Sequence, residues 1–254
     1  MMELSWWLWV AIPLAGAVAG FVNSMAGAGS LLTLPLLMLS GLPANVANGS
    51  NRVGILVQSL TSFWTYRRSG VGRGVSARWL VVPIVLGSVS GAVLAGHVGS
   101  GMMGKIIAVV MLPMVALLFV RPEKLRRNRS RLDPQEVFRR PYFWLIILAV
   151  SFYGGFVQVG ANFLILLVLT VVSGMDLLTA NAVKLLIQLV FTLSALPVYI
   201  YNGLVDWPLS LLMAAGCMGG SWLGVRLAVK RGQGLVKVVM VVCVLLFSAN
   251  LLLR

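Results

Sequence analysis

The chain has 254 residues, of which 59% are hydrophobic and 10% are charged, and its mean hydropathy is +0.97. A soluble core of this length does not need so much apolar sequence, so the composition excludes an ordinary soluble protein and predicts one integral membrane domain over residues 1–254. The net charge of +14 lies mainly in short regions between apolar runs. This placement argues against a nucleic-acid partner and favours contact with the headgroups of a lipid bilayer.

Ten apolar segments are predicted in chain order, with boundaries good to a few residues. They cover about 5–24, 30–41, 44–66, 77–97, 102–120, 141–160, 163–174, 177–201, 207–225 and 234–253. The second and seventh segments are unusually short. A helix of about eleven residues rises roughly 16 Å, which is about half of the hydrocarbon core of a bilayer.

The basic residues predict how the chain is oriented. Fifteen of the 20 Lys and Arg residues fall in three regions, at 67–78, 121–140 and 226–233. The positive-inside rule places these regions in the cytoplasm. Counting the crossings between them predicts that both short segments cross the membrane and that both termini lie outside. We therefore expect a multi-pass protein of the inner membrane.

Two parts of the chain resemble each other and predict an internal repeat. The first repeat covers about 5–120, the second about 141–254, and a basic cytoplasmic linker at 121–140 joins them. A shift of 133 residues aligns Gly41 with Gly174, Asn48 with Asn181, Tyr66 with Tyr199, Gly70 with Gly203, and the run 30–40 with 163–173. Shifts of 135 and 129 align "GFVN" at 20–23 with "GFVQ" at 155–158, and Gly87 and Gly91 with Gly216 and Gly220.

Each repeat contains five segments, and consecutive repeats with an odd number of crossings run in opposite directions. The predicted fold class is thus an all-α integral membrane protein with two inverted-topology repeats of about five membrane segments each. Each repeat has one short or broken helix. Such segments at matching places in two halves point to a midplane binding site. The alternative is that glycines such as Gly27 and Gly29 merely permit close helix packing.

Polar side chains gather on one face of each long segment that follows a short one. They include Asn48, Arg52 and Ser59 in the third segment, and Asn181, Lys184, Gln188 and Thr192 in the eighth. No acidic residue lies in the middle of a predicted span, so Arg52 and Lys184 lack a carboxylate partner at that depth. An unpaired charge in hydrocarbon costs at least several kcal/mol. A bound anion would compensate the two charges; alternatively, both side chains reach the membrane interface by snorkelling.

Two stretches carry a resemblance to a known family. "GFVNSMAGAGSLLTLPLLMLSGLPANVANGSNRVGILVQSLTSFWTYRRSG" is similar to the opening motif of the TauE/SafE sulfite-exporter-like permeases, and "GMDLLTANAVKLLIQLVFTLSALPVYIYNGLVDW" to its second-half counterpart. The resemblance covers nearly the whole chain and rests on diffuse motifs. It implies export or uptake of sulfur oxyanions and organosulfonates such as sulfite, thiosulfate or sulfoacetate. Asn162 stands where the family pattern has a glycine, and it joins Gly27 and Gly29 as a candidate site residue.

The sequence therefore predicts a secondary transporter, and specifically an exporter, of small sulfur-containing oxyanions. It would act by alternating access around a cationic midplane site. An anion channel with the same lining and a non-transporting structural subunit are the alternatives. No Ser/His/Asp set, metal cluster or carboxylate pair falls within the spans, so we expect neither an enzyme nor a cofactor. The expected partners are a small anionic substrate and the bilayer.

Overall fold

A computed structural model describes residues 8–72, 74–118 and 133–252, and within these ranges the regular structure is entirely helical. The helices are α1 (Leu8–Met25), α2 (Ser30–Leu39), α3 (Ala44–Arg68), η1 (Arg78–Leu80), α4 (Val81–Gly96), α5 (Ser100–Leu118), α7 (Pro134–Arg139), α8 (Pro141–Phe156), α9 (Ala161–Val171), α10 (Leu177–Tyr201) and α11 (Trp207–Leu252). This architecture confirms the all-α class. Residues 119–132, which form most of the predicted linker, and Arg73 lie outside the described residues.

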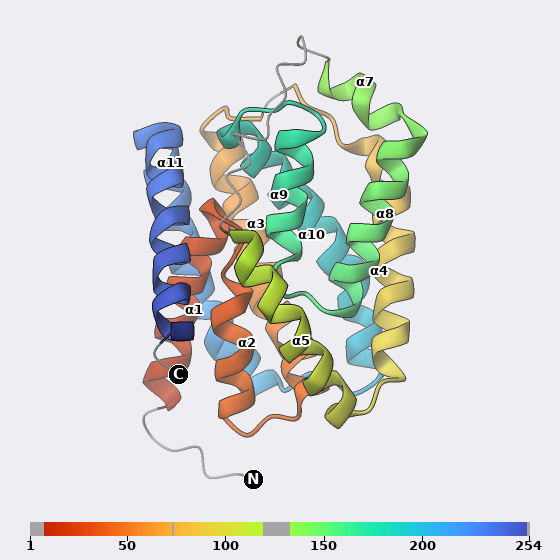
Figure 1. Ribbon diagram of the computed structural model, residues 1–254, viewed down its shortest axis with the longest axis vertical. Coiled ribbons are helices and arrows are strands. Elements are labelled where there is room, and N and C mark those ends of the chain that lie inside the picture. The colour runs from red at the N-terminus through yellow and green to blue at the C-terminus, as the bar shows by residue number, and fades with distance from the viewer. Residues whose placement is uncertain (1–7, 73, 119–132, 253–254) are drawn as a thin grey trace.

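The helices follow the ten predicted segments closely. The ninth and tenth segments are the two arms of α11, which are separated at Gly232, where φ is 67° and ψ is −160°. Figure 1 shows that the chain reverses direction at this point. Two details differ from the prediction. The short helix α7 was not expected in the linker, and α8 ends at Phe156, a few residues before the predicted end of its segment.

The basic regions gather at one end of the bundle. In Figure 1 the end of α3, the reversal in α11 and helix α7 all lie at the top, whereas α1 begins and α11 ends at the bottom. This is the arrangement that the predicted topology requires. The placement of the basic end in the cytoplasm stays a prediction, because it rests on the charge distribution of the loops.

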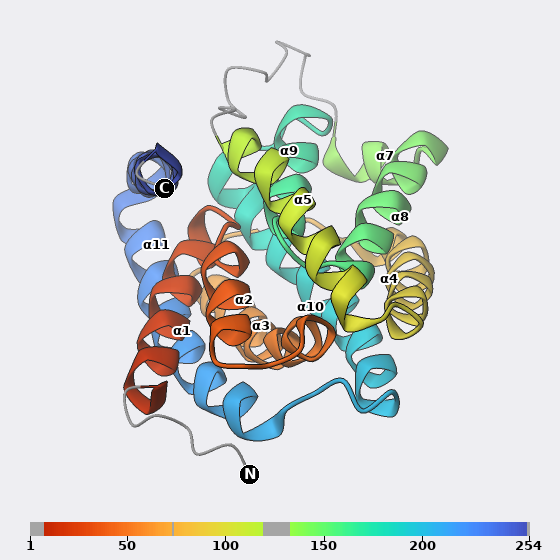
Figure 2. The ribbon, with the colours of Figure 1, turned by 60° about the horizontal axis from the view of Figure 1, so that its bottom comes forward.

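Helices α2 and α9 are the two short elements, with 10 and 11 residues. Among the described residues, four helical stretches are long and apolar enough to cross a membrane: Leu8–Met25, Arg78–Gly96, Leu177–Tyr201 and Trp207–Gly232. Helix α3 is also long, with 25 residues, but it carries many polar side chains, and these are buried by the surrounding helices. Figure 2 shows α3 enclosed between α1, α2 and α10. The bundle therefore shields a polar helix from lipid.

Six of the nine left-handed glycines of the described residues form three pairs that are 133 residues apart. The pairs and their φ angles are Gly27 (78°) with Gly160 (69°), Gly41 (93°) with Gly174 (67°), and Gly70 (79°) with Gly203 (67°). A positive φ is readily adopted only by glycine, so each pair marks the same kind of turn in both halves. One of these pairs lies at the two helix breaks, and the inverted repeat itself stays a prediction.

Two helix pairs pack through glycines at close range. On the α1–α11 contact, a Cβ atom at Gly220 would lie 1.8 Å from the carbonyl oxygen of Ala17. On the α4–α8 contact, a Cβ atom at Gly91 would lie 2.1 Å from the carbonyl oxygen of Phe152. The alignment of Gly91 with Gly220 thus corresponds to equivalent packing sites. At both sites a side chain would collide with a backbone that cannot move aside easily.

Replacing Gly220 with alanine is expected to destabilise the bundle by about 1–3 kcal/mol, because overpacking forces the backbone of α1 away. Gly219 is the matched control, since no atom lies within 4 Å of the position of its Cβ. Alanine at position 219 should be neutral or slightly stabilising, owing to its higher helix propensity. Thermal unfolding of both variants in detergent measures the difference. Equal midpoints would contradict the close approach of α1 and α11.

Candidate functional site

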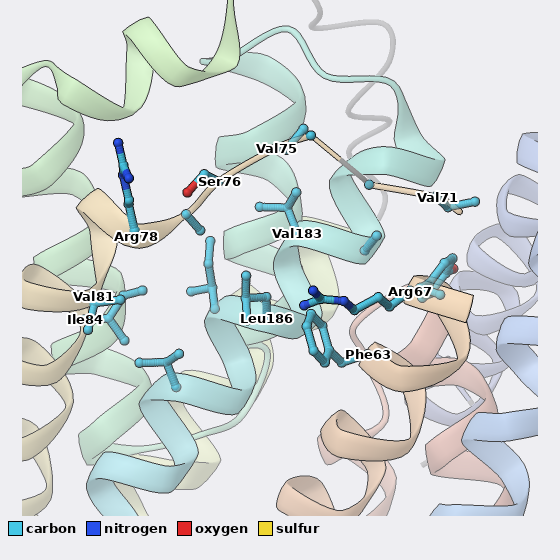
Figure 3. Close-up of a pocket in the computed structure, with 17 residues that line it drawn as sticks. Phe63, Arg67, Val71, Val75, Ser76, Arg78, Val81, Ile84, Val183 and Leu186 are labelled. Atoms are coloured by element: carbon cyan, nitrogen blue, oxygen red, sulfur yellow. The ribbon is translucent and has the colours of Figure 1, made fainter. Parts of the chain in front are cut away.

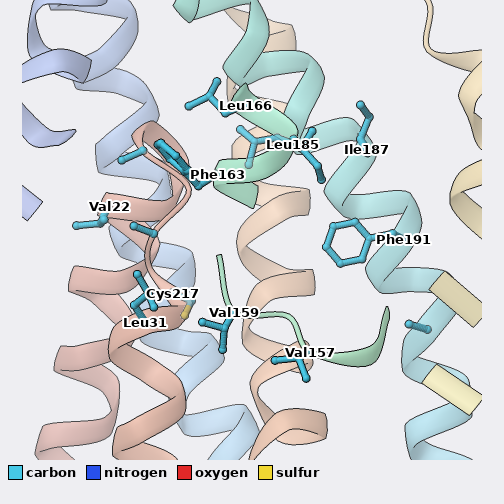
Figure 4. Close-up of a cluster of buried hydrophobic side chains, with 14 of the residues drawn as sticks. Val22, Leu31, Val157, Val159, Phe163, Leu166, Leu185, Ile187, Phe191 and Cys217 are labelled. Carbon is cyan, nitrogen blue, oxygen red and sulfur yellow. The ribbon is translucent and has the colours of Figure 1, made fainter. Parts of the chain in front are cut away.

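The two helix breaks meet inside the bundle. A Cβ atom at Gly27, in the α1–α2 turn, would lie 2.8 Å from the backbone of Asn162 and Phe163 at the start of α9. The Oγ atom of Ser30 accepts a hydrogen bond from the backbone N–H of Gly160 at 3.2 Å. In Figure 4 the α8–α9 connection, with Val157 and Val159, passes through the buried cluster of side chains. The interrupted helices of the two halves are thus in direct contact.

Side-chain amides continue this contact between the breaks. The Nδ2 atom of Asn162 donates to Oδ1 of Asn23 at 3.3 Å, and Nδ2 of Asn23 donates to Oε1 of Gln58 at 3.2 Å. In the second half, Nε2 of Gln158 donates to Oγ1 of Thr192 at 3.2 Å. Asn23 and Gln158 correspond in the "GFVN" and "GFVQ" alignment. Each break therefore carries an amide that contacts the long polar helix of its own half.

Arg52 belongs to α3, and its guanidinium lies at the C-terminal end of α8. Its Nη2 atom donates to the carbonyl oxygens of Gly154 at 3.0 Å and Gly155 at 2.6 Å, and to the hydroxyl oxygen of Tyr199 at 3.0 Å. The guanidinium carbon lies 4.1 Å from the centre of the Tyr199 ring, which adds a cation–π contact. The guanidinium of the first half thus caps a helix of the second half.

Asn48 and Tyr199 complete this cluster. The Nδ2 atom of Asn48 donates to the carbonyl oxygen of Phe156 at 2.8 Å and to the hydroxyl of Tyr199 at 2.9 Å. The Tyr199 hydroxyl in turn lies 3.0 Å and 2.9 Å from the carbonyl oxygens of Gly155 and Phe156, to which it can donate its one proton. The last carbonyls of α8 are therefore satisfied by side chains of α3 and α10.

Lys184 makes the reciprocal contact. Its Nζ atom donates to the carbonyl oxygen of Asn23 at 2.9 Å, near the end of α1, and to Oδ1 of Asn181 at 2.7 Å. The Nδ2 atom of Asn181 donates to the carbonyl oxygen of Leu177 within its own helix at 3.1 Å. The cation of the second half thus lies at the C-terminal end of a helix of the first half.

Helix C-termini explain how the two buried charges are tolerated. The last carbonyls of a helix have no partner within it, and the helix dipole places a partial negative charge there. Arg52 and Lys184 both have an exposed fraction of 0% and point inward to such ends. This burial argues against snorkelling to the interface. Each cation also fixes one half of the protein against the other, because its helix and the capped helix belong to different halves.

Several buried polar atoms of α3, α9, α10 and the α8–α9 connection have no hydrogen-bond partner among the described residues. The donors are Nε and Nη1 of Arg52, Nδ2 of Asn51 and the Nε2 atoms of Gln58 and Gln188, and the amide acceptors are on Asn48, Gln158, Asn162 and Gln188. Buried polar groups are normally paired, and each unpaired one costs about 1–3 kcal/mol. A ligand with several oxygen atoms, together with water, could pair the free donors.

The ten candidate site residues are all buried, but they make different contacts. Asn48, Arg52, Asn181 and Lys184 form the two capping clusters, and Thr192 and Asn162 bond to the breaks. Gln188 has no hydrogen-bond partner within the described ranges, and Ser59 donates to the carbonyl of Ile55 in its own helix at 2.6 Å. Gly27 and Gly29 allow close backbone contacts, since a Cβ atom at Gly29 would lie 2.3 Å from the Ala19 carbonyl oxygen. Substrate binding by these residues stays a prediction.

Sequence reasoning did not assign roles to Asn23, Gln158 and Tyr199. The signals were present, because the repeat alignment pairs Asn23 with Gln158 and Tyr66 with Tyr199. What the alignment could not reveal is that Tyr199 contacts Arg52 and Asn48, which lie on another helix of the other half.

A bundle of apolar helices in which two interrupted helices meet around buried polar groups is the architecture of a multi-pass membrane transporter. The chain belongs to the sulfite exporter TauE/SafE family, whose model matches residues 12–251. It is 28% identical over 236 residues to "Probable membrane transporter protein YfcA" of Escherichia coli K12, covering 92% of this chain and 86% of that protein. It is 26% identical to "Probable membrane transporter protein ORF9" of Sinorhizobium sp, covering 99% and 95%. No solved structure matches the chain significantly.

Proposed function

We propose that this membrane transporter carries small sulfur-containing oxyanions out of the cell by alternating access. The observation that carries the proposal is the buried guanidinium of Arg52, whose Nε and Nη1 donors have no partner in the part of the chain that the structure describes. Unpaired amide donors of Gln58 and Gln188 lie on the same two polar helices, α3 and α10. The family name supports a sulfur oxyanion as the substrate. The names of the relatives support transport as the activity.

An oxyanion suits this set of groups for chemical reasons. Sulfite, thiosulfate and sulfonates offer several acceptor oxygens, and a guanidinium forms strong charge-assisted hydrogen bonds with them. Amide side chains add donors whose orientation can adapt to the ligand. The full burial of Arg52 and Lys184 favours a carrier over a channel, because an open pore would hydrate these cations.

The membrane potential suffices as the driving force in this proposal. No Asp, Glu or His lies in the middle of a predicted span, and such residues commonly form the proton relays of coupled carriers. Moving one negative charge outward through an inside-negative potential of 100 mV releases about 2.3 kcal/mol. A dianion gains about twice this amount, which favours efflux.

The test is flux in liposomes that contain the purified protein, with sulfite, thiosulfate and sulfoacetate as substrates. The membrane potential and the pH gradient are set independently. We expect saturable flux that follows the potential, with a limiting gradient of roughly 50-fold for a monoanion at 100 mV. Flux that follows the pH gradient at zero potential, after correction for substrate protonation, would contradict the uncoupled mechanism.

Two other outcomes identify the alternatives. Flux that does not saturate, and that shows no exchange of external for internal substrate, would indicate a channel. A correctly folded protein without flux of any of the three anions would exclude them as substrates and favour a structural subunit. An empty liposome and the Arg52→Ala variant serve as the matched controls.

A further inference from the structure

The two ends of the bundle differ, although the repeat alignment pairs residues of one end with residues of the other. At the basic end, a cavity of about 770 Å³ lies between the end of α3, the connection to α4 and the first half of α10. We call this cavity the vestibule. Its rim carries the exposed Arg67 and Arg78, so it reaches the surface at that end. Figure 3 shows Arg67 and Phe63 on one wall and Val183 and Leu186 of α10 on the other.

Tyr66 lines the vestibule, and its hydroxyl group is buried. Its side chain is only 1% exposed, yet its hydroxyl group has no hydrogen-bond partner among the described residues. The equivalent residue in the second half is Tyr199, whose hydroxyl contacts Arg52, Asn48 and the end of α8. One tyrosine of the pair is thus engaged and the other is free.

Some of the residues equivalent to the vestibule lining are tightly packed at the opposite end. Ala182 lines the vestibule, whereas a Cβ atom at its counterpart Gly49 would lie 1.9 Å from the carbonyl oxygen of Leu204. The connection after α10 is also bonded to α3, because the backbone N–H of Asp206 donates to Oγ of Ser50 at 2.8 Å. The end that holds Tyr199 is therefore closed where the other end is hollow.

We propose that Tyr199 and Tyr66 are paired gating residues of the transport pathway. When Tyr199 is bonded to Arg52, the pathway is closed at the end of the bundle that holds Tyr199. It is open at the basic end, through the vestibule. In the opposite state, Tyr199 is released and Tyr66 makes the equivalent contacts with Asn181 and the end of α1, beside Lys184. The anion enters from the vestibule past Arg67. This inference rests on the proposed transport function but is testable without a substrate.

Two matched positions report which end is open. Leu186 is partly exposed and lines the vestibule, whereas its equivalent, Val53, is 6% exposed and packs against Leu196 and Ala214. Each is replaced by cysteine in a chain whose Cys217 and Cys243 are changed to alanine. The purified protein in nanodiscs is then treated with a water-soluble maleimide, which has access to both faces. We expect fast labelling at position 186 and slow labelling at position 53.

The Tyr199→Phe substitution removes the engaged hydroxyl and should shift the equilibrium to the opposite state. A net hydrogen-bond contribution corresponds to about a 2- to 12-fold change in population. Labelling at position 53 should rise by about that factor, and labelling at position 186 should fall. Tyr66→Phe is the matched control and should leave position 53 slow and position 186 fast. Ser50→Ala, which loosens the Asp206 contact, should act in the same direction as Tyr199→Phe.

If Tyr199→Phe raised labelling at position 53 and at position 186, the substitution would have loosened the whole bundle. If neither Tyr199→Phe nor Ser50→Ala changed the labelling, these contacts would not form a gate. Either result overturns the inference. The same variants are assayed for anion flux, which separates the two proposals. Reciprocal labelling without anion flux in the parent protein would retain the gates and reject the substrate class. Flux with no reciprocal labelling would retain the transporter and reject the gates.

Discussion

Replacing Arg52 with alanine is expected to weaken anion affinity by roughly 10- to 150-fold, because a charge-assisted contact contributes about 1.5–3 kcal/mol. The substitution also removes the Arg52 donor from the carbonyl oxygens of Gly154 and Gly155, of which Gly155 keeps the Tyr199 hydroxyl as a donor, and it removes the cation from the ring of Tyr199. Each buried carbonyl left without a partner costs about 1–3 kcal/mol, so the thermal stability should fall as well. Substrate affinity is measured from the concentration dependence of flux, and stability from unfolding in detergent.

Arg52→Lys is the informative control. Lysine keeps the charge and can still reach a carbonyl oxygen, but it loses the planar guanidinium that stacks on Tyr199 and offers further donors. We therefore expect partial recovery of stability and incomplete recovery of affinity. If a correctly inserted Arg52→Ala protein transported anions with unchanged affinity, Arg52 would serve only to cap α8.

Replacing Lys184 with methionine should have the second-largest effect. The substitution keeps the apolar stem but removes the ammonium group from the carbonyl oxygen of Asn23 and from Oδ1 of Asn181. Two of its three donors are used by these protein acceptors, whereas two nitrogen atoms of Arg52 have no partner among the residues that the structure describes. We expect a loss of stability comparable to that of Arg52→Ala, and a loss of affinity toward the lower, roughly 10-fold end of the same range.

Asn181→Ala is the control for this position, because it removes one acceptor of Lys184 and leaves the contact with Asn23. Its effects on flux and unfolding should be smaller than those of Lys184→Met. Normal affinity in Lys184→Met, together with reduced stability, would confine anion binding to the Arg52 side of the site. Normal values of both would show that the contact with the end of α1 is dispensable.

Much of the fold followed from local properties of the sequence. Hydropathy and loop charge are carried by consecutive residues, so they predicted the helices, the two short elements and the positions of the basic regions. The alignment of Gly41 with Gly174 and of Gly70 with Gly203 also anticipated turns of the same conformation, because a positive φ selects glycine. Gly160 also falls on Gly27 under the same shift, with Ala161 on Ala28 and Asn162 on Gly29, although the sequence alone did not predict a positive φ for this pair.

The partners of the buried cations were decided by the tertiary structure. Arg52 and Lys184 are compensated by backbone carbonyls at the ends of α8 and α1, and every residue has a carbonyl, so no residue type marks these partners. The sequence also did not predict the difference between the two ends of the bundle. Tyr66 and Tyr199 are equivalent in the repeat, yet one is free and the other engaged. Two similar halves can adopt two related packings, and only the arrangement in space shows which half is closed.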